Sequence, residues 1–242
     1  MDTLNAPRLA GSDSETLTIA APLFVHETFV PRLATTTHGP IRCLALPAAL
    51  ITAYSRDNVF DAALMIGTDD AVPAAWSRVQ VGEVRYGLFA SPGLARRLGP
   101  TPSLEDLLAI PFVGPVFVSR QGELTPGNDR CPIPRSERTI GHEAETVGLA
   151  CRIAAETEHL VYGPVAAATP FVVDGTLVEV SVAGWAQTDP LYLACNGDSV
   201  SANAQDLLAT VIRASFETLR HESGVVELGG SAPQALRRLA SS

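Results

Sequence analysis

Two histidine–acid pairs have the residue types and spacing that could support chemistry in this sequence. His26-Glu27 follows an apolar run at residues 17–22, and His142-Glu143, with Glu145 two positions later, precedes a segment with helical spacing. Imidazole and carboxylate groups that meet can bind a divalent metal or transfer protons. Alternatively, these are ordinary exposed residues at helix starts, where neighbours point in different directions. Neither pair fixes a nucleophile, so we expect no catalytic residue and no metal ligand.

Other chemistries are excluded by what the sequence lacks. All 17 basic residues are arginine, so lysine Schiff-base chemistry, pyridoxal catalysis and a P-loop are ruled out. The G-x-S-x-G and H-E-x-x-H motifs are absent. The cysteines, at positions 43, 131, 151 and 195, form no C-x-x-C pair and are expected to be ordinary buried residues in a reducing compartment. We therefore expect no cofactor.

Composition indicates a folded chain of one or two domains. The 242 residues are 46% hydrophobic and 18% charged, with a net charge of −9. Without a basic face, the chain should not bind nucleic acid by itself. Residues 1–16 are polar and acidic rather than a secretory signal, and no apolar run reaches the roughly 18 residues needed to cross a membrane. The expected location is the cytoplasm, without membrane association.

The elements that must position these residues alternate between strand and helix. Strands are predicted at 17–22, 42–46 and 61–67, separated by helices near 25–33 and from Pro47 to about residue 56. This order predicts a parallel sheet with right-handed crossovers. Residues 79–90 fit two short strands or one bent strand.

A second set of elements follows Ser91. Helices are predicted after Pro92, from the N-cap Ser103 to residue 109, at 145–156 and, as a short turn, at 165–169. Strands are predicted at 112–118 and in the segment TLVEVSV. Residues 120–136 are predicted to form an irregular loop. A last strand at 191–196 and an amphipathic helix at 202–219 complete the chain. Two α/β sets predict two lobes with a cleft between them, the chain crossing near Ser91 and Thr188.

The sequence contains, in this order, the segments LTIAAPLFVHETFVPRLA, FDAALMIG, VGEVRYGLFASPGLARRLGPTPSLEDLLAIPFVGP and LYLACN, and a predicted helix follows the last of them. In order and spacing, these segments resemble the effector-binding domain of LysR-type transcriptional regulators. The resemblance covers about residues 17–219. It implies the periplasmic-binding-protein type II fold, with two Rossmann-like lobes, a small-molecule pocket between them and side-by-side homodimers. We expect residues 17–90 and 190–220 to form lobe I and 91–189 lobe II. Residues 1–16 would be a linker remnant, and 221–242 a poorly ordered tail.

The resemblance also sets the expected function and its alternatives. A full regulator carries a helix-turn-helix domain that this sequence lacks, so DNA would be reached only through that absent domain. The chain is either cut from a longer protein or a natural stand-alone domain. We expect it to bind a small-molecule effector and to dimerise. The alternatives are an enzyme on the same scaffold that uses the His and Glu pairs, and a partner that dimerises with full-length regulators.

The resemblance implies that the ligand is held by the loops after the first and third strands and by helix starts of lobe II. The implied ligand-binding residues are Pro22, Leu23, Phe24, Gly67, Thr68, Thr146, Tyr162 and Gly163. The loop Ala21-Pro22-Leu23-Phe24 offers no side-chain hydrogen bond where the family has small hydroxyl residues. This weakens the inference of a carboxylate ligand and favours a bulkier or more apolar effector, or a pocket that has lost its ligand. Alternatively, Phe24 belongs to the core and Thr146 is only a helix cap.

Two further features bear on the cleft and the dimer. Arg120 and Arg130 are the cations that could lie near the cleft mouth, unless both are simply solvated. The family pairing predicts that residues 25–34 of one subunit pack against residues 144–155 of the other. In that second segment one stripe is apolar and could instead be core: Val147, Ala150, Cys151 and Ala154.

Overall fold

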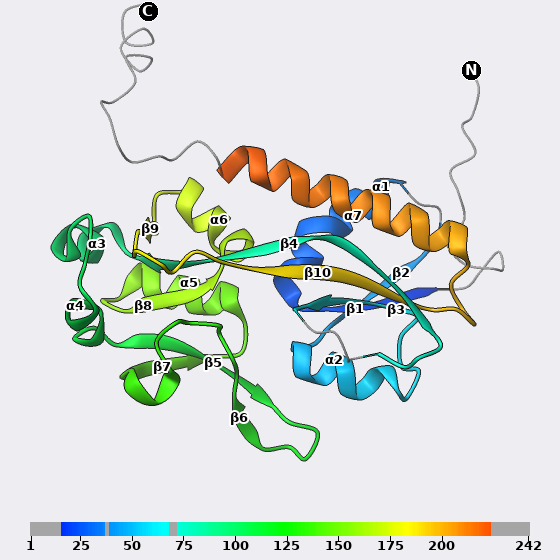
Figure 1. Cartoon of the computed structure of the whole chain (residues 1–242), viewed down its shortest axis with the longest axis horizontal. Coiled ribbons are helices and arrows are strands. Elements are labelled where there is room, and N and C mark those ends of the chain that lie inside the picture. The colour runs from blue at the N-terminus through cyan, green and yellow to red at the C-terminus, as the bar shows by residue number, and fades with distance from the viewer. Residues whose placement is uncertain (1–15, 37–38, 68–71, 224–242) are drawn as a thin grey trace, which may run out of the picture.

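The strands join into one central sheet with helices on both sides (Figure 1). The computed structural model describes residues 16–36, 39–67 and 72–223. The strand order is β2-β1-β3-β10-β4-β8-β5-β6, with β7 paired to β5 and β9 to β4. The sheet therefore has a first half around β1–β3 and a second half around β5, β7 and β8, with β4 and β10 between them.

The first half contains the parallel strands that the sequence predicts. β1 (Leu17–Ala21) pairs in parallel with β2 (Ile41–Ala45) and with β3 (Ala62–Ile66), through the connecting helices α1 (Leu23–Thr36) and α2 (Ala48–Ser55). The helix α7 (Ala202–Ser223) packs against α1 and covers the same side of the sheet, while α2 covers the other (Figure 1).

Alternate residues of each strand in this half face different helices. Ile19, Ala21 and Leu64 belong to the core cluster that includes α1 and α7 residues. Ala20 and Ala63 belong to the cluster that contains Ile51 of α2. Because both faces are buried, β3 is apolar throughout, and β1 has a single polar residue, Thr18, instead of an alternating pattern.

The second half is built from shorter elements. Its strands are β5 (Phe112–Val118), β6 (Leu124–Pro126), β7 (Ile140–Ala144), β8 (Leu160–Pro164) and β9 (Val178–Val180). Its helices are α3 (Pro92–Leu98), α4 (Leu104–Leu108), α5 (Val147–Glu156) and α6 (Val165–Val173), with a 3-10 turn at Arg135–Glu137. Ser103 caps α4 in a capping box with Asp106, which confirms the predicted helix start.

Two long antiparallel strands connect the halves. β4 (Trp76–Ala90) is a single strand, one of the two predicted alternatives, and pairs with β8 and β9 at its far end. β10 (Gln187–Asn196) lies between β3 and β4 and starts four residues before the predicted Leu191. The polypeptide therefore passes between the halves through β4 and returns through β10.

Several local predictions need correction. Pro47 is the N-cap of α2 and not its first residue, because its ψ of 146° is extended while its carbonyl accepts the first helical hydrogen bonds. The segment 120–136, predicted to be irregular, contains β6 and the 3-10 turn. His142 and Glu143 lie in strand β7 instead of a helix entry. Helix α6 extends to Val173, beyond the short turn that was expected.

The apolar stripe of α5 is core. Ala150, Cys151 and Ala154 are buried against Val113 and Val161 of the sheet, so they cannot form a docking stripe. Helix α7 continues to Ser223, into the segment predicted to be a tail. Most of the predicted linker remnant, residues 1–15, and residues 224–242 lie outside the described ranges. Within those ranges no helix is both long and apolar enough to span a membrane.

Candidate functional site

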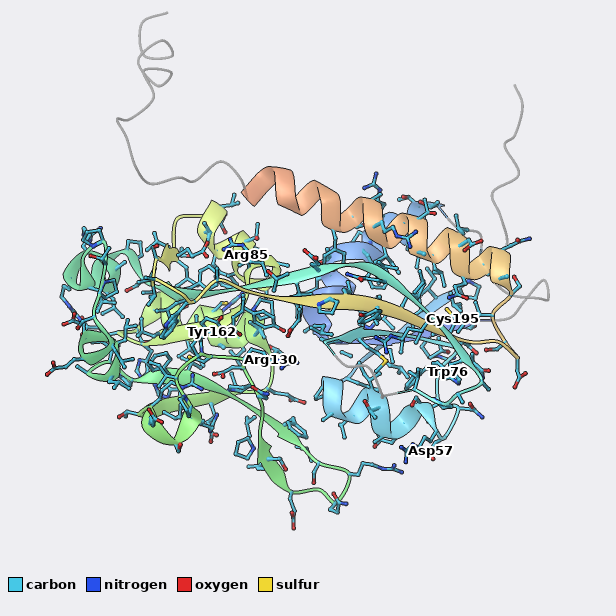
Figure 2. All side chains as sticks on the ribbon, viewed as in Figure 1. Asp57, Trp76, Arg85, Arg130, Tyr162 and Cys195 are labelled. Atoms are coloured by element: carbon cyan, nitrogen blue, oxygen red, sulfur yellow. The ribbon has the colours of Figure 1, made fainter. Side chains whose placement is uncertain are left out.

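The candidate site lies where the two halves of the sheet meet. The amide of Gly67, directly after β3, donates to the carbonyl of Pro190 in β10 at 2.9 Å. From the other half, Pro164 at the end of β8 pairs with Tyr86 of β4. The carboxyl ends of β3 and β8 thus point at one region, the place where α/β sheets bind ligands. We call Gly67, Tyr86, Arg130, Tyr162 and Asp189 the junction site. Arg130 and Tyr162 are labelled in Figure 2.

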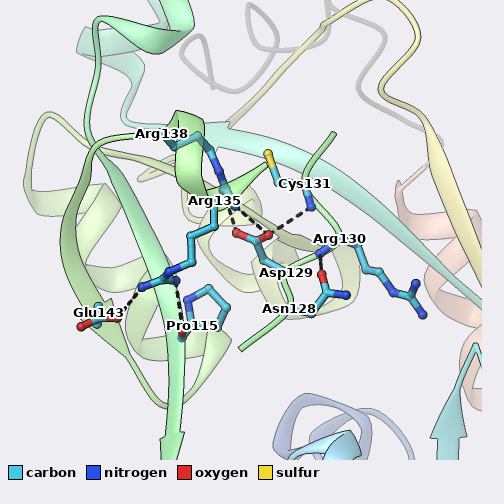
Figure 3. A network of polar contacts seen from close by, with 8 residues as sticks. All are labelled: Pro115, Asn128, Asp129, Arg130, Cys131, Arg135, Arg138 and Glu143. Carbon is cyan, nitrogen blue, oxygen red and sulfur yellow. Dashed lines mark hydrogen bonds and ion pairs between the residues drawn. The ribbon is translucent and has the colours of Figure 1, made fainter. Parts of the chain in front are cut away.

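A buried ion pair fixes the loop that carries Arg130. Asp129 accepts two hydrogen bonds from the guanidinium of Arg138, at 2.7 and 3.0 Å, and a third from the amide of Cys131 at 3.1 Å (Figure 3). The side chains of Arg138 and Asp129 are only 2% and 9% exposed. Next to them, Asn128 accepts from the amide of Arg130 at 2.9 Å. These contacts hold Arg130 in the left-handed region, with φ +63°.

The Arg130 side chain reaches across the junction. Its Nε lies 3.1 Å from Oδ2 of Asp189 in β10. Its Nη2 lies 2.8 Å from the point where a Cβ on Gly67 would be, so a side chain at this position would require the guanidinium to shift. Gly67 also has φ +71°, which favours glycine independently. The contact joins a loop of the second half to β3 and β10.

Aromatic side chains surround this ion pair. The rings of Tyr86 and Tyr162 are stacked with centroids 6.2 Å apart, and Trp185 lies edge-on to Tyr162 at 5.8 Å. The Tyr162 hydroxyl donates to the carbonyl of Trp185 at 3.2 Å. Burial, and then the charge of Asp189, raises the pKa of Tyr86, while burial foremost raises the pKa of Tyr162 to about 12. Both hydroxyls therefore stay protonated at neutral pH and can donate hydrogen bonds.

The loop after β1 turns directly into α1. The carbonyl of Pro22 accepts hydrogen bonds from the amides of Val25 and His26. Leu23 is 40% exposed, whereas Phe24 is 8% exposed and packs in the main core. Of the apolar residues predicted here, Leu23 is therefore the one most open to solvent.

Two predicted residues of the second half, Thr146 and Gly163, lie at the start of α5. Thr146 is the N-cap, and its hydroxyl accepts from the amide of Leu149 at 3.2 Å. A Cβ on Gly163 would lie 3.1 Å from Val147, so the end of β8 touches this helix start. Tyr162 is 3% exposed. Thr68, predicted beside Gly67, lies outside the described residues.

The histidine–acid pairs lie in unrelated surroundings. His26 is 5% exposed and donates from Nε2 to the carbonyl of Leu44 in the edge strand β2, and burial lowers its pKa. The rings of His142 and His159 lie 4.6 Å apart and are tilted by 34°, while Glu143 pairs with Arg135. In the described part of the chain, no group of three His, Cys, Asp or Glu residues could hold a metal ion. The structure therefore offers no acid–base or metal constellation built on these pairs.

The cysteines are free thiols, and two of them, Cys43 and Cys131, are not fully buried as expected. Cys43 is exposed because β2 is the edge strand of the sheet. Cys131 is half-buried, and burial raises the pKa values of Cys151 and Cys195 to about 12. Protonated buried thiols are poor nucleophiles.

Arg120 contacts the first half at a different place. It lies at the start of the turn that joins β5 to β6, where its Nη2 is 3.0 Å from Asp57 and its guanidinium lies over the ring of Tyr54. Sequence reasoning missed Asp189 and Tyr86 as neighbours of Arg130, and Trp185 as a neighbour of Tyr162. The one available signal was the position of Asp189 beside the predicted crossing near Thr188.

Comparisons with known proteins agree with this architecture. A family model described as the LysR substrate binding domain matches residues 10–216. The structure is similar to a probable transcriptional regulator from Pseudomonas aeruginosa, with a TM-score of 0.66 and 21% identity, covering 86% of this chain and 69% of that chain. The regulatory domain of AphB from Vibrio vulnificus gives a TM-score of 0.54 and 16% identity, covering 83% of this chain and 98% of that chain.

A variant of the OxyR2 regulatory domain from Vibrio vulnificus gives a TM-score of 0.63 and 13% identity, covering 87% of this chain and 99% of that chain. Among curated protein sequences the search found no match. Identities this low establish the fold alone, which is the type II periplasmic-binding-like fold. The family model spans most of the sequence, so the chain belongs to the LysR substrate binding domain family, the effector-binding domain of LysR-type regulators.

Proposed function

We propose that this domain binds a small-molecule effector between two lobes, residues 17–90 with 190–220 and residues 91–189. The observation that carries the proposal is the meeting of Gly67, Arg130 and Asp189 at the junction, where strand ends from both halves converge. Of the described strands, β4 and β10 run from one half into the other, so bending them would change the angle between the lobes (Figure 1).

The proposed ligand contacts come from both sides of the junction. They are Pro22, Leu23, Phe24, Gly67 and Thr68 from the first lobe, and Thr146, Tyr162 and Gly163 from the second. The exposed Leu23 would cover an apolar part of the effector, since the loop before α1 has no hydroxyl side chain. The hydroxyl of Thr146, at the start of α5, would bind a polar group.

The effector acts as a signal only if it binds one arrangement of the lobes better than another. We infer that this difference passes to a second copy of the chain and, through a helix-turn-helix domain, to DNA. We place this activity in the cytoplasm, where a LysR-type regulator meets DNA. Nothing in the proposal needs a cofactor or a catalytic residue.

Affinity measurements test the proposed contacts. Native mass spectrometry of the purified chain identifies a bound small molecule, and calorimetry then gives its affinity. Thr146→Val should weaken binding by about 5- to 150-fold, since a buried ligand group loses a hydrogen bond worth roughly 1–3 kcal/mol. Ser103→Ala removes the cap of α4 instead and should leave affinity unchanged. If Thr146→Val binds like the wild type, Thr146 is not a ligand residue.

The homodimer is a separate part of the proposal. Outside the buried stripe of α5, Leu149 is 49% exposed. We infer that α1 of one subunit packs against the exposed side of α5 of the other. Leu149→Glu should then produce monomers in sedimentation experiments at micromolar concentration, whereas Leu104→Glu, at an equally exposed leucine of α4, should not. A wild-type chain that sediments only as a monomer would contradict the pairing.

A further inference from the structure

The guanidinium of Arg130 has an edge that the described part of the chain leaves unpaired. Its Nε faces Asp189, and neither Nη1 nor Nη2 has a hydrogen-bond partner among the described residues. The side chain of Arg130 is 38% exposed, so part of it is open to solvent. Arginine binds carboxylate and phosphate groups best through two parallel N–H bonds.

Asp189 does not complete such a pairing. Its Oδ2 is buried, and although it lies within ion-pair distance of Nε, it makes no hydrogen bond of good geometry. Asp189 is held in β10 opposite Val84 of β4, and its charge also acts on the buried Tyr86. Oδ2 of Asp189 therefore stands in an ion pair with Nε without taking a hydrogen bond from the guanidinium.

The position of Arg130 is set before any ligand arrives. The buried Asp129–Arg138 pair and the Asn128 turn fix its backbone, and Gly67 leaves the space that its Nη2 occupies. Because a preorganised side chain loses less conformational entropy on binding, such an arginine is a better anchor than a free surface arginine.

We propose that Arg130 anchors an oxyanion group of the effector, a carboxylate or a phosphate. The inference rests on the proposed function, since it assigns a chemical class to the ligand of that site. The apolar start of α1 at Pro22 and Leu23 follows β1, the strand next to β3 and Gly67. An effector that joins an acidic group to an apolar body fits both features. Its oxyanion competes with Asp189 for Arg130 and so loosens the contact between this loop and β10.

The test uses the full chain with sodium phosphate and sodium acetate as probes, titrated at constant ionic strength. Dissociation constants are measured from shifts of arginine Nε–H signals in ¹H–¹⁵N NMR spectra, with backbone amides followed in the variants. Arg130→Gln should weaken binding of at least one probe about tenfold or more. The matched control is Arg120→Gln, because Arg120 also has one aspartate partner at 3.0 Å and is 47% exposed. This control should bind like the wild type.

A third variant separates anchoring from a structural role. Asp189→Asn removes the competing charge, so it should tighten probe binding by up to about fivefold. If the ion pair only supported the fold, both Arg130→Gln and Asp189→Asn would weaken binding. Tighter binding of phosphate than acetate indicates a phosphorylated effector, and the reverse indicates a carboxylic acid.

Equal dissociation constants for the wild type and Arg130→Gln with both probes would overturn the inference. That result leaves the proposed function intact if native mass spectrometry still finds a small molecule whose affinity falls in Thr146→Val. If neither Thr146→Val nor Arg130→Gln changes the affinity of that molecule, the proposed function fails as well.

Discussion

Arg138 and Asp129 form a two-hydrogen-bond ion pair, 2.7 and 3.0 Å long, in a place almost closed to solvent. The guanidinium also lies over the ring of Phe112, with 5.1 Å to its centroid. Arg138 directly follows the 3-10 turn, and Asp129 lies in the loop that precedes this turn and carries Arg130. The pair therefore links the end of the turn to this loop. The position of a solvent-exposed cation at the junction therefore depends on a buried pair nearby.

Removing one partner of this pair should destabilise the fold strongly. In Arg138→Met, Asp129 remains as a buried charge without its partner, and the free energy of unfolding should fall by about 3–5 kcal/mol. Urea denaturation followed by circular dichroism measures the change. Arg97→Met is the matched control, since Arg97 pairs with Glu158 at an exposed position and should show little loss. Equal losses in both variants would contradict the role of the buried pair.

The space above Gly67 can be tested with a second glycine of the same backbone conformation. Gly67 and Gly175 both have φ +71°, but a Cβ on Gly175 would meet nothing within 4 Å. In both Gly67→Ala and Gly175→Ala, backbone strain should lower the free energy of unfolding by roughly 1 kcal/mol. Gly67→Ala should lose more, because its Cβ displaces the Arg130 guanidinium. Thermal unfolding of the two variants compares them, and an equal loss would show that Arg130 moves aside freely.

Stability should fall in mild acid because of His26. Burial lowers the pKa of His26 below its ordinary 6.5, so the unfolded chain binds a proton at this residue at a higher pH than the folded chain does. The contribution of His26 to the free energy of unfolding is therefore fully present above about pH 6.5, and it is lost as the pH falls toward the pKa of His26 in the folded chain. Urea denaturation between pH 8 and pH 5 should show a smaller loss in His26→Gln. Parallel curves for the two proteins would exclude His26 as the cause.

Thiol reactivity should follow burial. Cys43 on the edge strand is exposed, whereas Cys151 and Cys195 are buried with raised pKa values. An aromatic disulfide reagent at pH 8 should therefore modify Cys43 first in the folded chain. Cys43→Ser should remove this fastest phase, and Cys151→Ser should leave it in place. A fast phase that persists in Cys43→Ser would mean that another thiol is accessible.

The sequence by itself determined the order of the elements and much of their local detail. Apolar runs predicted β1 and β3, because strands buried on both faces cannot alternate with polar residues. The hydroxyl of Ser103 predicted the start of α4, since an N-cap bonds amides only three residues away. These signals are short-range, so one sequence suffices to read them. The order of the motifs also identified the family.

The tertiary structure alone decided which of these residues meet. Arg130 lies between Gly67 and Asp189, each about sixty residues away in the sequence. A buried ion pair and a left-handed backbone position the Arg130 loop, and the strand register positions Gly67 and Asp189. The two histidines looked equivalent in sequence, yet the fold buries His26 and leaves His142 at the surface. Contacts of this kind depend on the path of the whole chain, and no local pattern records that path.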